Sequence, residues 1–85
     1  MADLYEQADS VNSREDFAQF VNALRSDLIA EPENWQNLTL EMYLDAISAW
    51  TQVMDRVYAN LGKSMPVEPS WETFAQILLA GKIYE

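Results

Sequence analysis

The side chains of this chain that could do acid–base or metal chemistry are carboxylates. The sequence contains no histidine and no cysteine. The commonest general base, the thiolate nucleophile and the usual zinc ligands are therefore missing. A Ser-His-Asp triad cannot be built, and no glycine-rich phosphate-binding loop occurs. Only pairs of carboxylates remain as candidate catalytic or metal-binding groups.

The best carboxylate pair is Glu41 and Asp45, one helical turn apart, with Asp55 further along the same polar side. Two carboxyl groups can cleave a glycosidic bond, but they need a cleft between them. A helical chain of 85 residues rarely encloses one. For Ca²⁺, the spacing lacks the glycine turn of an EF-hand loop. We therefore predict no enzymatic activity, no metal and no cofactor, with the carboxylates as solvated helix surface.

The charge of the chain favours basic partners. Fourteen acidic residues face five basic ones, giving a formal net charge of −9. Such a molecule repels nucleic-acid phosphates and anionic lipid headgroups, so we expect neither nucleic-acid nor membrane binding. Some of the acidic residues are expected to stabilise the fold, because they lie in the first turns of expected helices, where a negative charge is favourable. The remainder either attract a basic protein or keep the chain dissolved.

The hydrophobic pattern predicts an all-α fold, a compact bundle of three main helices at about 13–30, 39–61 and 70–82. The first helix has apolar residues at helical spacing and ends before Pro32. Its N-cap is Asn12 with Glu15 three residues on, or alternatively Ser13 with Asp16. The apolar residues of this helix are Phe17, Phe20, Val21, Leu24 and Leu28.

The second helix is capped by Thr39 and ended by Gly62. Apolar residues cover about half of its cylinder, which is typical of a helix with two neighbours. We therefore predict that it is the central helix of the bundle. The third helix, capped by Ser70, then supplies the missing side of the core with the inward-facing residues Trp71, Phe74, Ala75, Ile77 and Leu78.

Residues 12–85 are predicted to form a single α-helical domain. The first eleven residues are either a tail or a short extra helix that Asp3 or Glu6 could cap. No stretch of 18 apolar residues and no basic, apolar leader opens the chain. The expected location is therefore the cytoplasm.

Aromatic residues close to acids are the candidate contacts of a partner protein. Trp35 stands in a polar connection, and an alternative role for it is a lid over the end of the first two helices. The predicted partner-binding residues are Trp35, Tyr43, Asp45, Trp50 and Asp55. A second apolar flank of helix 39–61, formed by Met42, Ala46 and Val53, is a candidate homodimer seam.

Several segments resemble a small uncharacterised bacterial family classed as a domain of unknown function. The resemblance covers about residues 11–85, through "SREDF", "ENWQN", "PSW" and the closing "LLAGKIYE". It implies no activity, cofactor or catalytic residue. The small size and acidity are also similar to bacterial immunity proteins. We therefore predict a non-enzymatic protein–protein interaction module, with an immunity- or antitoxin-like inhibitor of a basic toxin or nuclease as the alternative.

Overall fold

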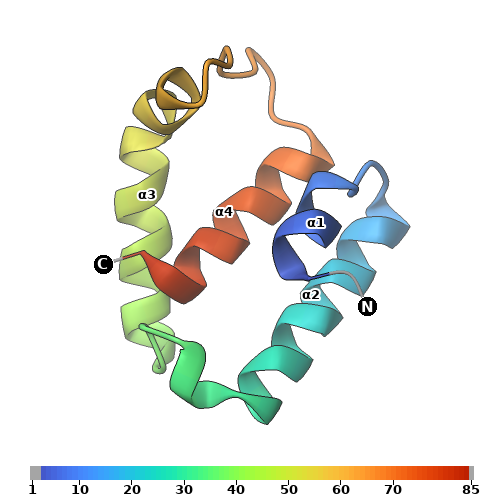
Figure 1. Cartoon of the computed structure of the whole chain (residues 1–85), viewed down its shortest axis with the longest axis vertical. Coiled ribbons are helices and arrows are strands. Elements are labelled where there is room, and N and C mark those ends of the chain that lie inside the picture. Colours follow the sequence, from blue (N-terminus) through green and yellow to red (C-terminus); the bar gives the residue numbers. More distant parts are fainter. Residues whose placement is uncertain (1–2, 85) are drawn as a thin grey trace.

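The computed structural model describes residues 3–84 and shows an all-α protein, as the hydrophobic pattern predicts (Figure 1). Within these residues there is no β-strand. Three long helices correspond to the three expected ones. The elements are α1 (Leu4–Asp9), α2 (Arg14–Ala30), the short 3-10 helix η1 (Pro32–Asn34), α3 (Leu40–Asn60) and α4 (Trp71–Ile83).

The helices begin at side-chain caps that the sequence signals locally. The Thr39 hydroxyl accepts a hydrogen bond from the Met42 amide at 3.1 Å. Ser70 and Thr73 form a capping box at the start of α4. At α2 the cap is Ser13, the alternative to Asn12, because the Ser13 hydroxyl accepts from the Asp16 amide. The backbone N–H of Asn12 donates to the Asp16 carboxylate, and Asn12 itself precedes the cap and lies outside the helix.

Helix α3 ends at a glycine, as the sequence predicts. Gly62 has a φ of 73°, a left-handed conformation that glycine adopts without a steric penalty. The Lys63 amide then donates to the Tyr58 carbonyl at 2.8 Å, which satisfies a carbonyl of the last helical turn. An exposed connection leads from Leu61 to Ser70 at the start of α4.

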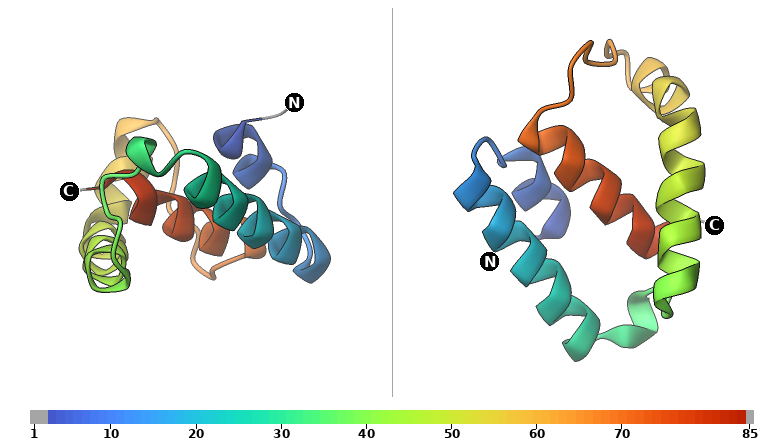
Figure 2. Two further views of the ribbon diagram at one scale, coloured as in Figure 1. Left: turned by 90° about the horizontal axis from the view of Figure 1, so that it is seen from below. Right: turned by 180° about the vertical axis from the view of Figure 1, so that it is seen from behind.

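The central helix is α4, so the prediction that helix 39–61 is central was wrong. Among the described helices, α4 packs against α1, α2 and α3, whereas α3 packs against α4 alone. Figure 1 shows α4 between α3 on one side and α1 and α2 on the other, and the turned views in Figure 2 agree. The apolar half of α3 exceeds what one neighbour covers. Large apolar side chains of α3 and its two ends therefore stay exposed: Leu38, Leu40, Met42, Leu44 and Leu61.

Small residues let α4 take this central place. Ala75, Ala80 and Gly81 are all buried, and short side chains allow neighbouring helices to approach closely. At Gly81 an added Cβ would lie 2.5 Å from Cε1 of Tyr43 and 2.6 Å from Cγ2 of Ile47. α3 therefore crosses α4 at a point where only glycine fits.

The main core lies between α1, α2 and α4. Phe20 of α2 is its largest fully buried side chain. Contrary to the expectation, Trp71 and Phe74 are 40% and 43% exposed. They lie at the start of α4, where the Trp71 ring packs on Phe17 at 5.4 Å and on Phe74 at 6.4 Å. Ala75 is buried as expected. The other buried positions of α4 are Thr73, Leu79, Ala80 and Gly81.

The opening of the chain forms a helix, which decides between the two alternatives for residues 1–11. The Asp3 carboxylate caps α1 by accepting from the Glu6 amide at 2.8 Å. Ala8 and Val11 are buried in the main core. The part of residues 1–11 that the structure describes is therefore packed against α2 and α4. Residues 1 and 2 lie outside the described part.

Candidate interaction surface

Trp35 is a core residue. It follows η1, is only 7% exposed and belongs to the main hydrophobic cluster. Its indole Nε1 donates to Oδ2 of Asp27 at 2.8 Å. This burial agrees with the lid alternative and leaves no exposed ring for a partner to cover.

Trp35 is part of a polar cluster that we call the C-terminal clasp, formed by Asp27, Trp35, Asn37 and Lys82. The Lys82 ammonium lies 2.9 Å from Oδ2 of Asp27 and 5.9 Å from the centre of the Trp35 ring. Nδ2 of Asn37 donates to the carbonyls of Gly81 and Tyr84 at 3.0 and 2.7 Å. The clasp thus ties the connection between α2 and α3 to the end of α4.

The clasp sets the charge state of Asp27. The hydrogen bond from Lys82 is the main reason why the pKa of the Asp27 carboxyl lies below its usual value, with a further contribution from the Trp35 indole. Partial burial works in the opposite direction and is outweighed. An ionised carboxylate that is paired in this way is a structural group.

Tyr43 is also turned inward. Its hydroxyl donates to the carbonyl of Leu78 at 2.7 Å, and its ring stacks on Trp35 with 6.1 Å between the centres. Burial raises the pKa of the Tyr43 phenol to about 12. Tyr43 therefore joins α3 to α4, where the sequence suggested a contact with a partner.

Asp45 and Asp55 are exposed on α3, but they do not face Trp50. Each stands five residues from Trp50, which corresponds to about 140° around an α-helix. Trp50 is half-buried on the side that faces α4. The structure therefore does not bring the five predicted partner-binding residues together in one surface.

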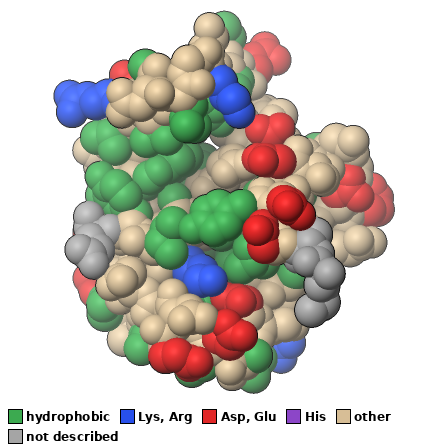
Figure 3. All heavy atoms as spheres, in the orientation of Figure 1, with side chains coloured by type: hydrophobic (Ala, Val, Ile, Leu, Met, Phe, Trp, Pro, Cys, Tyr) green, Lys and Arg blue, Asp and Glu red, His purple; other side chains and the backbone are tan. Residues whose placement is uncertain are grey.

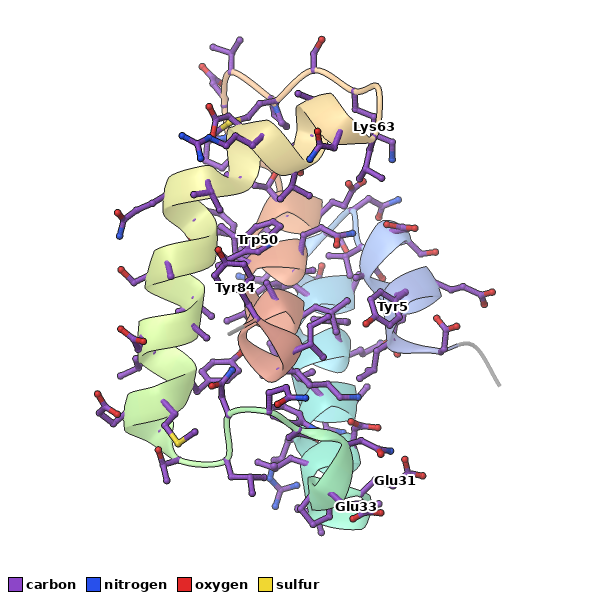
Figure 4. The ribbon with its side chains drawn as sticks, turned by 60° about the vertical axis from the view of Figure 1, so that its left-hand side comes forward. Tyr5, Glu31, Glu33, Trp50, Lys63 and Tyr84 are labelled. Carbon is purple, nitrogen blue, oxygen red and sulfur yellow. The ribbon has the colours of Figure 1, made fainter. Side chains whose placement is uncertain are left out.

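Trp50 instead lines a depression that we call the α3–α4 hollow, with a volume of about 90 Å³. Figure 4 shows Trp50 pointing from α3 towards α4, with Lys63 beyond the end of α3. Figure 3 shows hydrophobic side chains gathered over α3 and α4, with acidic side chains beside them towards α1. The lining residues are Asp9, Trp50, Val57, Tyr58, Leu61, Lys63, Glu72 and Gln76.

The hollow combines aromatic walls with negative charge. Burial raises the pKa of the Tyr58 phenol, and the nearby charges of Glu72 and Asp9 raise it further, while Thr73 partly opposes them. Nε2 of Gln76 donates to Oδ1 of Asp9 at 2.7 Å, which fixes this carboxylate at the edge of α4. Two acids from different helices therefore act on the same small space.

Most residues of this site have no signal in the sequence that would group them. Tyr58 and Leu61 could be placed near Trp50, because they share its helical stripe. Asp9 and Gln76 could not, because they are 67 residues apart and meet only through the packing of α1 on α4. No local pattern signals such a contact.

The candidate homodimer seam is not a continuous surface. Ala46 is 4% exposed, whereas Met42 is exposed and Val53 is half-buried. The middle of the proposed seam is therefore already covered within the chain, and only its two outer residues could contact a second copy.

Within residues 3–84, no group of three or more His, Cys, Asp or Glu side chains could hold a metal ion. Over the same residues, no helix is both long and apolar enough to cross a membrane.

Family comparison identifies the class of the protein. Residues 13–85 match the model of a family of unknown function, DUF7660, so the chain belongs to that family. The resemblance to a family of unknown function is thus confirmed. Comparisons with curated proteins and with solved structures find no match. Trp35, Asn37 and Lys82, which carried part of the resemblance, belong to the C-terminal clasp together with Asp27.

Proposed function

We propose that the protein is a non-enzymatic interaction module that binds a basic protein through the α3–α4 hollow and its rim. The observation that supports this is the composition of the hollow. Trp50 and Tyr58 supply aromatic surface, and Asp9 and Glu72 supply negative charge beside it. Buried aromatic anchors contribute much of the affinity of protein interfaces, and charges around them set encounter rate and orientation.

The size of the hollow favours a protruding side chain over a free small molecule. Sites for small molecules commonly enclose about 300–1,000 Å³. The α3–α4 hollow offers about 90 Å³. This space suits one side chain of a protein whose surface rests on the surrounding rim, including the exposed residue Leu61.

The net charge of −9 supports a basic partner. Opposite charges speed association, and like charges exclude acidic proteins and nucleic acids. The inhibitor of a basic toxin or nuclease is a special case of this proposal, in which the bound protein is itself a toxic enzyme. It adds the expectation that binding abolishes the activity of that enzyme.

Affinity capture with matched variants tests the proposal. The hollow variant is Asp9→Asn with Glu72→Gln, and the control is Asp45→Asn with Asp55→Asn, which removes the same charge from the outer side of α3. We expect a basic protein to be retained by the wild type and the control, lost by the hollow variant, and released as salt rises. Circular dichroism checks that all variants are folded.

Equal loss in both double variants would show that only net charge matters. Retention that is unchanged by salt and by the hollow variant would contradict the proposed surface. Identification of the retained protein then tells whether it is a toxin, and an assay of its activity in the complex tests the inhibitor alternative.

A further inference from the structure

The walls of the α3–α4 hollow suit a long side chain with an apolar stem. Trp50, Val57 and Leu61 provide hydrophobic surface, and the Tyr58 ring adds a second aromatic group. Arginine and lysine bury their methylene groups along such surfaces while the charged end stays at a polar rim. A hollow of about 90 Å³ has room for one such group.

The rim carries the charge that such a group needs. Asp9 comes from the end of α1 and Glu72 from the first turn of α4, so two elements hold the carboxylates on the same side of the hollow. The Asp9 carboxylate is held in place by Gln76 through one oxygen, and a carboxylate accepts several hydrogen bonds. Both negative charges act on the Tyr58 phenol, which shows that they bear on the interior of the hollow.

We infer that the α3–α4 hollow is a receptor for a single arginine side chain of the partner, held by Trp50 and Tyr58 and by the carboxylates of Asp9 and Glu72. This inference rests on the proposed function. A guanidinium group is planar, stacks on aromatic rings and is less strongly hydrated than an ammonium group. It also presents several donors in a fixed fork that matches carboxylates. Arginine therefore fits aromatic walls with an acidic rim better than lysine does.

Lys63 is the basic residue among those that line the hollow, and it lowers the affinity of the site. The ion pairs of residues 3–84 are Arg14–Glu15 and Lys82–Asp27, so Lys63 forms no ion pair with Asp9 or Glu72. Its positive charge lies close enough to oppose an incoming guanidinium, because exposed charges interact over about 8–10 Å at moderate salt. Lys63 is exposed and can be replaced without disturbing the core.

The test uses the full chain and three peptides, acetyl-Gly-Ser-X-Ser-Gly-amide, with X as Arg, Lys or Gln. In ¹⁵N NMR spectra, the indole N–H signal of Trp50 reports on the hollow. The signals of Trp35, buried in the clasp, and of Trp71, whose ring packs on Phe17 and does not line the hollow, are internal controls. We expect a saturable shift of the Trp50 signal with the arginine peptide, a weaker one with lysine, and none with glutamine.

Variants then place the peptide in the hollow. Glu72→Gln is expected to raise the Kd of the arginine peptide about three- to tenfold, the effect of losing one partly exposed charge partner. Lys63→Gln is expected to lower the Kd about two- to threefold for the same reason, with opposite sign. The control variant Asp45→Asn with Asp55→Asn is expected to leave the Kd unchanged, although it alters the net charge more.

Two results would overturn the inference. One is an equal response of Trp50 to the glutamine and arginine peptides. The other is a response to arginine that does not saturate and spreads over all acidic helix faces. If capture of a basic protein depends on Asp9 and Glu72 while the arginine peptide gives no shift, the arginine receptor is wrong and the proposed function stands. If the arginine peptide binds as expected while no basic protein is captured, the proposed function fails separately.

Discussion

Beside each end of α4 lies a cluster that contains a tryptophan, a lysine and a carboxylate, and the two clusters are in different states. The C-terminal clasp combines Trp35, Lys82 and Asp27, and the α3–α4 hollow combines Trp50, Lys63 and Glu72. In the clasp, the Lys82 and Asp27 side chains are 15% and 23% exposed and lie 2.9 Å apart. In the hollow, Lys63 is exposed and unpaired within the described residues, and Trp50 borders open space.

The same types of residue therefore form a closed network in one place and border open space in the other. In the clasp, Lys82 and the Trp35 indole both pair with the Asp27 carboxylate, and the Asn37 amide donates to two backbone carbonyls. No buried side-chain polar atom of residues 3–84 lacks a partner. Such a network stabilises the fold and offers little to a ligand. In the hollow, the aromatic surface and the carboxylates border open space.

The largest expected effect on stability comes from replacing Trp35 by alanine, compared with the same replacement at Trp50. Trp35→Ala removes a buried ring and leaves Asp27 without its indole donor, which should cost about 3–5 kcal/mol of unfolding free energy. Trp50→Ala removes a half-buried ring and should cost about 1–2 kcal/mol. Urea denaturation of both variants measures the two free energies. Equal losses would show that the hollow is as much a part of the core as the clasp.

A smaller effect is expected at the crossing of α3 and α4. A Gly81→Val side chain would meet Tyr43 and Ile47 at 2.5 to 2.8 Å, and overpacking of this kind should cost about 3 kcal/mol. Gly62→Ala is the control, because it lies in open space and bears only the strain of a positive φ, about 1 kcal/mol. For a domain of this size, thermal melting should drop by about 4–8 °C per kcal/mol.

The smallest of the three effects depends on pH. The pKa of Asp27 is lower in the folded chain than in the unfolded chain, so its contribution to stability is present above the unfolded pKa of about 3.9. That contribution is lost as the pH falls through the folded value. Asp27→Asn should cost about 1–2 kcal/mol at pH 7, and this difference from the wild type should shrink below about pH 4.

Urea denaturation between pH 7 and the acid limit of folding measures this trend. Asp45→Asn is the matched control, because its exposed carboxylate takes no part in the clasp. A constant difference between the wild type and Asp27→Asn down to acid pH would show that the ion pair with Lys82 does not contribute.

The helices could be predicted from the sequence, because their signals are local. Apolar spacing, the caps Thr39 and Ser70, and the left-handed Gly62 each act within one or two turns of chain. The predicted elements at about 39–61 and 70–82 therefore agree closely with α3 and α4. The family resemblance was also carried by short segments of sequence.

Which helix is central, and which acids lie beside aromatic rings, depends on how the helices pack. α4 is central because its small residues admit three neighbours, which the apolar width of a helix does not reveal. Asp9 reaches Gln76 across 67 residues, and Asn37 reaches Tyr84 across 47. Such contacts depend on how whole helices pack. For this reason the sequence does not reveal that the clasp is closed and the hollow open, although both use the same residue types.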